Sequence, residues 1–522
     1  MKINKTQLLG VSITLMMAAC SLDYDPIDTY SEKTEGAAAQ GAAADTAAEL
    51  VIFKDKAAAD NQRLALYQRM KDAQETWYLD LLLLAEVHAD NAYAGATDNQ
   101  TTPFEVNSIE GSNINLDRDW NNSNGYMNSI AIANKLIAGI DHVPDAALTE
   151  AMRKQYKAEA LIFRAMMYFD MVRIWGSVPL ITGMATTITS VNIDEAYDTY
   201  FPPQTDELSV YKQIEADLLA ALPDAPNVDN GDKSLLSKAL ANTLLAKVYA
   251  EKPLRNYSKV KEYCDAVTGF TLVNDFGDLF GVVLANSAVA PGADNMAVDA
   301  KNRNTPETIL EIPFASGSKN WVSWMFGRAM DDWAFYFSFV KWILPSRDLM
   351  SAFDAEGDTE RKNETIVYDS WEISGYGYPK THYPFMYKCR SQFNSIIKYR
   401  YADVLLLKAE ALILGDGDFA GAAAIINQLR TRAGIADISV PASQSDAVNV
   451  LLKERRLELA FEGHRWFDLC RLDKVEEVLN SLPTRDPARP ALAIPYSANS
   501  YKLPIPQNVI DQNPNLEQNP GY

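Results

Sequence analysis

Acids, arginines, a histidine and a cysteine are concentrated near the C-terminus, in Glu454–Arg471, which reads ERRLELAFEGHRWFDLCR. Carboxylate, imidazole and thiol groups transfer protons and attack substrates in enzymes, so an active site is one interpretation. The other interpretation is structural. Arg455 and Glu458 are three residues apart, and side chains at that spacing pair on a helix surface. Because apolar residues also recur at helical spacing, the pattern favours one helix over 446–480 that is held by charge pairs.

No other combination of residues in the sequence completes a catalytic or metal-binding motif. The four histidines are far apart and lack metal-ligand spacing: His88, His142, His382 and His464. The chain has neither a G-x-S-x-G nucleophile motif nor a glycine loop for phosphate. The alternating acids of residues 354–360, DAEGDTE, lack the glycine and final glutamate of a calcium loop, and favour a turn or an ion pair with Arg361. We therefore expect no metal, no cofactor and no enzyme activity.

Aromatic residues are concentrated between residues 320 and 342. Aromatic planes can stack on the apolar C–H faces of sugar rings, while polar side chains bond the hydroxyls. Polar groups are present in the same stretch, at Asn320, Arg328, Asp331 and Asp332. Phe335, Phe337 and Phe339 alternate as on one face of a strand, so much of the set is expected to form a small core. We expect one to three of four residues to be exposed as a stacking platform: Trp321, Trp324, Trp333 and Tyr336.

The first residues have the form of a lipoprotein signal. Two lysines precede a short apolar stretch, Leu8–Ala19, which ends in small residues just before Cys20. The stretch is too short to span a bilayer. We therefore expect a signal peptide over 1–19, lipidation of Cys20 and a flexible tether over 20–45. No later stretch is long and apolar enough for a transmembrane helix, so the expected attachment to the membrane is the lipid anchor.

Charge and cysteine content narrow the possible partners. The 522-residue chain has a net charge of -21 and would repel a polyanion, which excludes nucleic acid as a partner. The cysteines after Cys20 lack CxxC spacing and are too few for all to pair, so they are expected to be mainly buried thiols. They are Cys264, Cys389 and Cys470.

Helical periodicity covers most of the chain, over 46–269 and again over 396–522. Within 396–433, an Ala- and Leu-rich helix, a Gly-Asp turn and a second helix predict an αα-hairpin like a tetratricopeptide unit. Residues 270–395 are instead rich in Asn, Gly, Asp and aromatics, with short β-like runs. We therefore predict a mainly all-α fold in a single domain, 46–522. Its helix pairs form a scaffold, and residues 270–395 form an irregular insertion that binds ligand.

Six stretches together have the pattern of one protein family: AEALIFRAMMYFDMVRIWGSVPLI, LANTLLAKVYAE, YRYADVLLLKAEAL, INQLRTRAGI, ERRLELAFEGHRWFDLCR and LPIPQNVIDQNPNLEQNPGY. They resemble the SusD/RagB family, whose members are outer-membrane nutrient-binding lipoproteins of Bacteroidetes. The resemblance runs from the residues before Cys20 to the last residue and is thinnest over 270–395. The helix FEGHRWFDL together with the ending QNPGY is its most specific part.

The resemblance implies four tetratricopeptide-like helix pairs with an inserted variable region. It also implies a lipid-anchored protein on the outer membrane, facing the cell exterior. Its partner would be a SusC-like TonB-dependent transporter, over which the lipoprotein sits as a lid. Members of this kind are binding proteins and not enzymes.

In this family the loop after the first long helix tends to reach the ligand surface. Here that loop, ADNAYAGATDNQTTPF, has no tryptophan, which departs from glycan-binding members. It offers Tyr93, Asp98, Asn99 and Phe104. A third and weaker candidate is SGYGYP, residues 374–379, beside Trp371.

The sequence therefore favours a binding lipoprotein that captures an oligosaccharide or polysaccharide and delivers it to the transporter. Two alternatives stay open at this point. One is a peptide-binding protein of the same transporter system, which would read peptide backbone with polar groups along a cleft. The other is a glycoside hydrolase, because a catalytic pair of carboxylates cannot be recognised among so many acids.

Overall fold

The structure is a computed structural model that describes the chain from Val51 onward, apart from short gaps. The described residues are 51–73, 80–95, 100–121, 125–184, 197, 200–228, 231–292, 294–314, 320–328, 330, 341–371 and 375–522. Within them helices dominate, and the strands form four two-stranded sheets. The predicted mainly α-helical class is confirmed. No helix in the described part of the chain combines the length and the apolar character that crossing a membrane requires.

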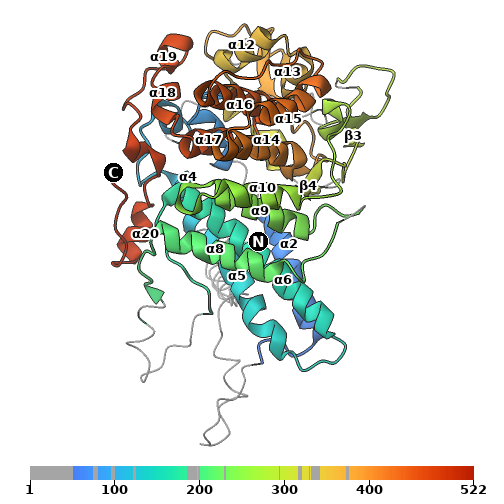
Figure 1. Cartoon of the computed structure of the whole chain (residues 1–522), viewed down its shortest axis with the longest axis vertical. Coiled ribbons are helices and arrows are strands. Elements are labelled where there is room, and N and C mark those ends of the chain that lie inside the picture. The colour runs from blue at the N-terminus through green and yellow to red at the C-terminus, as the bar shows by residue number, and fades with distance from the viewer. Residues whose placement is uncertain are drawn as a thin grey trace, which may run out of the picture. The chain divides into compact units, whose positions relative to one another are not determined.

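The helices of the first half pack against one another in chain order: α5 on α6, α6 on α8, α8 on α9 and α9 on α10 (Figure 1). Helix α2, the first in the described residues, packs against α5 and α6. Most of these helices begin at a residue whose side chain accepts a backbone N–H of the first turn, which satisfies a donor that the helix itself cannot. These residues are Asp55, Thr149, Asp206, Ser237 and Asn256. The helix bounds are α2 Lys56–Asp72, α5 Tyr126–Gly139, α6 Glu150–Trp175, α8 Glu207–Ala221, α9 Lys238–Ala250 and α10 Tyr257–Asp265.

The helices of the second half continue the packing through α14, which contacts α9 and α10 on one side and α15 and α16 on the other. The predicted hairpin over 396–433 is present as α14 and α15, joined by a π-helical turn and by Gly417, whose φ is +67°. Its first five residues differ from the prediction, because they form a strand that pairs with β4. The bounds are α14 Tyr401–Ala411, η7 Leu412–Asp416, α15 Phe419–Arg432, α16 Gln444–Leu459, α17 Arg465–Arg471, α18 Val475–Leu479, α19 Leu482–Arg485, η8 Ala498–Tyr501 and α20 Gln507–Gln512.

The region between the two sets of helices contains most of the strands, as its composition predicts. The sheets are antiparallel pairs: β1 with β5, β2 with β3, β4 with β8, and β6 with β7. The strands are β1 Ala92–Ala94, β2 Val282–Leu284, β3 Ala297–Ala300, β4 Thr308–Ile312, β5 Ile343–Pro345, β6 Ile366–Asp369, β7 Tyr383–Met386 and β8 Ile396–Arg400. The described residues also form short helices: η3 Leu83–Val87, α3 Thr102–Val106, α4 Ile114–Asn121, η4 Ile140–His142, η5 Lys252–Leu254, η6 Phe276–Leu279, α11 Trp321–Met325, α12 Arg347–Glu356 and α13 Thr359–Thr365.

The predicted single helix over 446–480 is wrong, because the chain breaks it between α16 and α17. Phe461 and Gly463 have φ of +63° and +82°, which no α-helix contains. The Gly463 N–H donates to Oε1 of the buried Glu86 at 3.0 Å, and a Cβ on Gly463 would lie 3.2 Å from Leu81. The glycine therefore permits both the left-handed turn and the close contact with η3.

The charged residues of Glu454–Arg471 pair mainly with distant elements, so most of the predicted ladder along one helix surface is wrong. Asp468 and Arg471, three residues apart on α17, do pair as predicted, at 2.8 Å. Glu458 is fully buried and accepts hydrogen bonds from Arg361 at 2.9 Å and Arg400 at 2.6 Å, and from Arg432. Arg465 pairs with Asp90 at 2.8 Å. Buried charges are tolerated only when they are paired and hydrogen-bonded, so this network holds several elements in register. We conclude that the stretch is structural.

Two predictions about single residues in this region are confirmed. Asp358 pairs with the buried Arg361 at 2.6 Å and caps α13, so the acidic run over 354–360 contains a structural ion pair. The cysteines in the described part of the chain, Cys264, Cys389 and Cys470, form no disulfide and are buried or partly buried.

Candidate functional site

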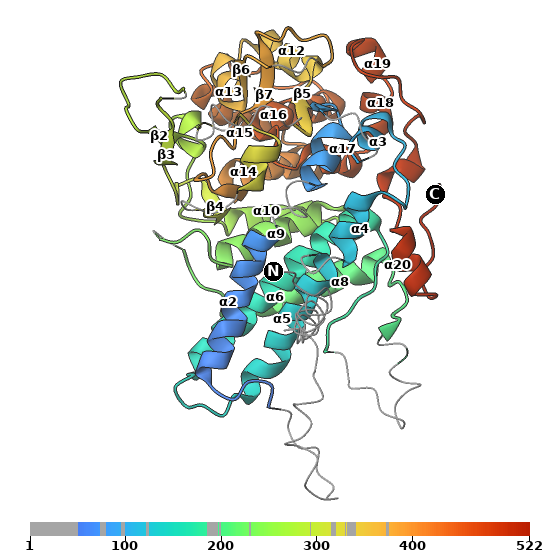
Figure 2. The same ribbon diagram turned by 180° about the vertical axis from the view of Figure 1, so that it is seen from behind.

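Two of the predicted ligand-binding segments meet in the β1–β5 sheet. Tyr93 lies opposite Leu344, and the N–H of Gly95 donates to the carbonyl of Trp342 at 2.9 Å. A Cβ on Gly95 would lie 2.0 Å from the carbonyl oxygen of Lys341, so a glycine is required for this approach. In Figure 2 the blue segment that carries α3 lies beside β5. The loop after the first helices and the end of the aromatic stretch are therefore neighbours, although about 250 residues separate them in the sequence.

The third predicted segment, 374–379, joins the same place through Tyr376. Its ring stacks on Tyr93 with centroids 4.2 Å apart and an interplanar angle of 7°. Its hydroxyl donates to Oε2 of Glu105 at 2.5 Å and lies 2.9 Å from the carbonyl of Ala94. Tyr376 has a φ of +54°, a left-handed conformation that is unfavourable for a residue with a Cβ. The stacking and hydrogen bonds hold this residue in the strained conformation beside β1.

Tyr93 and Phe104 belong to the core, which corrects the expectation that they face a ligand. Tyr93 is 0% exposed and Phe104 is 1% exposed. The Tyr93 hydroxyl donates to Asp486 at 2.6 Å and accepts the backbone N–H of Arg347 at 3.0 Å. A ring with no accessible face cannot stack on a sugar. These two residues instead fix the course of the loop.

The polar residues predicted to serve the aromatic stretch also have structural partners where they are described. Asn320 is 2% exposed, caps α11, and donates to the carbonyl of Asn394 at 2.9 Å. Arg328 is 2% exposed and pairs with Asp369 at 2.7 Å. Both are therefore part of the frame, and Asp331 and Asp332 lie outside the described residues.

Of the predicted platform, Trp321 is partly buried against the core at the start of α11. Trp324 lies in the same helix, but its side chain is outside the description. Trp333, Tyr336, Asp98, Asn99 and Cys20 lie outside the described residues. Their exposure stays a prediction.

Trp342 and Tyr376 are partly exposed aromatics at the meeting point that the sequence reasoning did not name individually as site residues, although Tyr376 lies in the third candidate segment. The N–H of Trp342 donates to the carbonyl of Met325 at 3.1 Å, which ties β5 to the end of α11. The guanidinium of Arg118 lies 5.9 Å from the Trp342 ring. Trp342 ends the aromatic stretch over 320–342 and Tyr376 lies in the segment 374–379, and this membership is the sequence signal that could have found them. Trp342 contacts Gly95 through its backbone carbonyl, and the Tyr376 hydroxyl lies 2.9 Å from the carbonyl of Ala94, so both partly exposed aromatics lie beside β1.

The electrostatics of this place come from Glu105 and Arg489. Glu105 is buried, and burial raises the pKa of its carboxyl, although the nearby Arg489 opposes the shift. Arg489 donates to the carbonyls of Val87, Ala89 and Ala92, so it supports the backbone that leads into β1. In the described part of the chain no three His, Cys, Asp or Glu side chains are grouped to hold a metal ion. The arrangement is suited to binding through aromatic faces.

Two family models match the chain. One is described as the SusD family and matches residues 370–522; the other is described as "Starch-binding associating with outer membrane" and matches residues 54–250. A SusD-like protein P2 of Formosa agariphila is 27% identical over 399 residues, which cover 70% of this chain and 74% of that protein. A SusD-like protein of Bacteroides ovatus is 24% identical over 515 residues, which cover 89% and 82%.

Solved structures with the same fold confirm the architecture. A laminarin-binding SusD-like protein superposes with a TM-score of 0.69 at 22% identity, covering 90% of this chain and all of that one. The surface glycan-binding protein A of Bacteroides fluxus gives 0.68 at 21% identity, covering 90% and 99%. The chain belongs to the SusD/RagB family, whose members are non-catalytic binding proteins that associate with the outer membrane.

Proposed function

We propose that the protein captures a glycan at the cell surface and delivers it to a SusC-like TonB-dependent transporter. The observation that carries the proposal is the convergence at the β1–β5 sheet. There the loop after the first helices, the aromatic stretch and the Tyr376 segment meet. Trp342 and Tyr376 retain partial exposure at this place, and Trp321, which is also partly exposed, lies on α11, whose end is tied to Trp342 by the hydrogen bond to Met325. Aromatic faces around polar backbone suit sugar rings, which present apolar faces and hydroxyls together.

Further aromatic and polar residues are proposed to complete the surface. The segments that carry Trp333 and Tyr336 lead into β5, and the segment that carries Asp98 and Asn99 leads out of β1. Together with Trp324 they are proposed to line the ligand. The known glycan-binding relatives of the same fold support a carbohydrate ligand; one is named for laminarin.

The proposed attachment rests on the first residues. Residues 1–19 would be the signal peptide, Cys20 the lipidated residue, and residues 20–45 a tether to the domain over 46–522. A tether of this length lets the domain cover a transporter in the same membrane. The ligand insertion is proposed to extend over about 270–395, with the loop that contains β1 added to it.

A glycan panel tests the ligand class. The mature protein without its lipid is run in native gels that contain soluble polysaccharides, and calorimetry follows with oligosaccharides of those that retard it. We expect retardation by at least one glycan. Retardation by none, together with calorimetric binding of peptides, would replace the glycan by a peptide on the same scaffold.

A further inference from the structure

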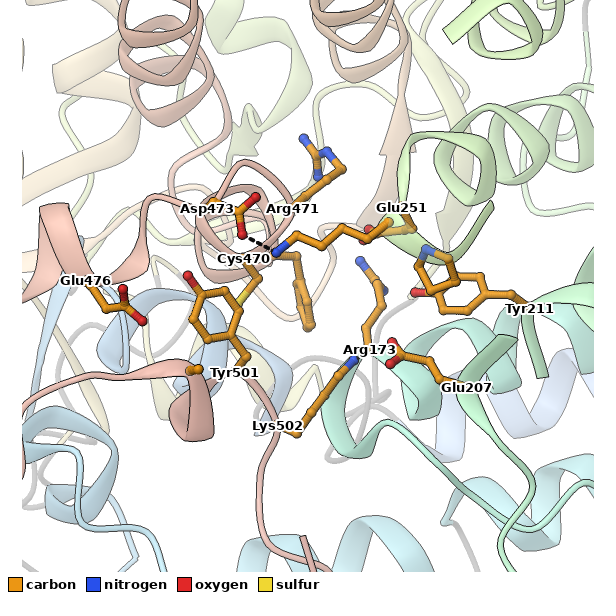
Figure 3. A pocket seen from close by; sticks show the side chains of 14 residues that line it. Arg173, Glu207, Tyr211, Glu251, Cys470, Arg471, Asp473, Glu476, Tyr501 and Lys502 are labelled. Carbon is orange, nitrogen blue, oxygen red and sulfur yellow. Dashed lines mark hydrogen bonds and ion pairs between the residues drawn. The ribbon is translucent and has the colours of Figure 1, made fainter. Parts of the chain in front are cut away.

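A cavity of about 520 Å³ opens in the helical scaffold and shares no lining residue with the candidate site (Figure 3). It lies where the C-terminal ends of α6, α9 and α17 meet the start of α8 and the short helix η8. The C-terminal end of a helix carries a partial negative charge from its unpaired carbonyls. Three such ends favour positive charge at the cavity, and the partial positive charge at the start of α8 opposes only one of them.

Each cation that lines the cavity already has a carboxylate partner. Lys502 pairs with Glu207 at 2.7 Å, and Lys252 pairs with Asp473. Arg173 pairs with Asp170 at 2.5 Å. Arg471 pairs with Glu410 at 2.7 Å and with Asp468 at 2.8 Å. The charges of these four residues are therefore neutralised by direct contacts.

Glu251 is the exception among the charged groups buried at this cavity. It is 9% exposed, and its carboxylate makes no hydrogen bond or ion pair with any residue that the structure describes. Burial raises the pKa of the Glu251 carboxyl. The nearby cations Arg471, Arg173 and Lys502 lower this pKa, but they offset the effect of burial only in part. Glu251 is also the C-cap of α9, where the helix itself disfavours a negative charge. The carboxyl group of Glu251 therefore lines the cavity without a direct hydrogen-bond or ion-pair partner among the described residues.

A second buried polar group faces the same space. Tyr211 is 1% exposed, and no described residue accepts from or donates to its hydroxyl. Burial, followed by the charge of Glu251, holds the pKa of this hydroxyl well above its usual range. Figure 3 shows the Tyr211 ring entering from α8 with its hydroxyl turned into the cavity. The wall also contains the rings of Phe467 and Tyr501.

We propose that this cavity binds a protonated amine or guanidinium group, with Glu251 as its counterion and Tyr211 as a second hydrogen-bond acceptor. The group is carried by a small molecule or by a lysine or arginine side chain of a docking protein. An anion would meet the unpaired carboxylate and three helix C-terminal ends, and a neutral ligand would leave the charge of Glu251 uncompensated.

Cations that belong to the protein already act in this way at the same helix ends. The ammonium of Lys502 donates to the carbonyl of Val172 in the last turn of α6 at 3.0 Å. The guanidinium of Arg255 donates to the carbonyl of Arg471 at the end of α17 at 2.6 Å. The proposed ligand would extend this pattern to the carboxylate that lacks a partner. The proposal does not depend on the ligand bound at the candidate site.

The first test compares a cation with its neutral isostere. Nα-acetyl-L-arginine amide, Nα-acetyl-L-lysine amide and Nα-acetyl-L-citrulline amide are titrated against the full mature domain by calorimetry at constant ionic strength. We expect the arginine or the lysine derivative to bind at least about tenfold more tightly than citrulline, because a hydrogen bond to a charged group is worth that factor. Equal binding of citrulline, or binding by none of the three, would overturn the proposal.

The second test uses matched variants of two carboxylates at the same cavity. Glu251→Gln keeps the shape of the side chain but removes its charge, and should weaken the cation about tenfold or more. Glu476, which also lines the cavity, is solvent-exposed, so Glu476→Gln should change the affinity less than about twofold. Circular dichroism confirms that both variants fold. An affinity that is the same in the Glu251→Gln variant and the wild type refutes the assignment.

The source of the cation is decided with two further probes. Agmatine presents a guanidinium on a small molecule, and a ten-residue peptide presents one arginine among glycines and serines. Tighter binding of agmatine assigns a small-molecule ligand, and tighter binding of the peptide assigns a docking protein whose backbone adds contacts. Failure of both to compete with Nα-acetyl-L-arginine amide would contradict the proposal.

Discussion

Arg400→Met perturbs the buried charge network at its best-connected member. Arg400 is 1% exposed, and its guanidinium donates to Glu307, Glu458 and Glu462, each at 2.6 Å. Methionine replaces the apolar stem but leaves three buried carboxylates with fewer counterions. Removal of one partner from a buried ion pair costs about 3–5 kcal/mol, because the remaining charge stays desolvated. The free energy of unfolding should fall by that amount.

Urea unfolding followed by tryptophan fluorescence measures this loss. The matched control is Lys408→Met, because Lys408 pairs with Asp265 at 2.5 Å in a pair whose side chains are 33% and 59% exposed. An exposed pair contributes about 0–1 kcal/mol, so the control should unfold close to wild type. A loss of less than about 1 kcal/mol for Arg400→Met, or equal losses for both variants, would refute the view that the buried charge network around Glu454–Arg471 stabilises the fold.

Three further predictions follow from the backbone and the charges. Gly95→Ala places a Cβ 2.0 Å from the Lys341 carbonyl and should destabilise the fold by roughly 1–3 kcal/mol and weaken ligand binding; Gly183→Ala, which meets nothing within 4 Å, is the calorimetric control. Gly463→Ala should cost about 1–3 kcal/mol in denaturant titrations, because alanine is strained at a φ of +82°. Burial would raise the pKa of the Glu458 carboxyl, but the surrounding arginines hold this pKa well below its usual range. The ionised carboxylate therefore stabilises the fold above the pKa of the unfolded chain, near 4.5, and this stabilisation is lost as the pH falls below that value. Melting temperatures between pH 7 and pH 3 should therefore decline on the acid side, with a smaller decline for Glu458→Gln.

Local signals predicted the helices well. The hairpin of α14 and α15 follows from helical periodicity and a glycine turn that lie within a few residues of each other. The same reasoning placed the helical scaffold on either side of an irregular region. Both features depend on interactions that are short in sequence.

Partners distant in sequence could not be predicted. Tyr93 was expected at a ligand surface because it lies in a polar loop, yet its hydroxyl is bonded to Asp486, nearly 400 residues away. The sequence pattern pairs the charges of Glu454–Arg471 with each other, since it shows only the spacing within that stretch. In the structure their main partners are Asp90, Arg361 and Arg400, which belong to other elements. A sequence pattern gives the spacing of side chains along one element, and burial is decided by what packs against it.

The central claim is that exposed aromatic side chains of this protein bind a glycan. Its most direct test is a calorimetric titration in which a glycan that retards the wild-type protein is added to a variant that lacks one of these aromatics. Trp333→Ala should weaken binding about tenfold or more without lowering the melting temperature, because an aromatic that anchors a ligand carries a large share of the affinity. Tyr200→Ala is the matched control, since Tyr200 is 46% exposed on a different part of the chain and should bind as wild type. Unchanged affinity in Trp333→Ala, or a collapse of its melting temperature, would contradict the proposed aromatic glycan surface.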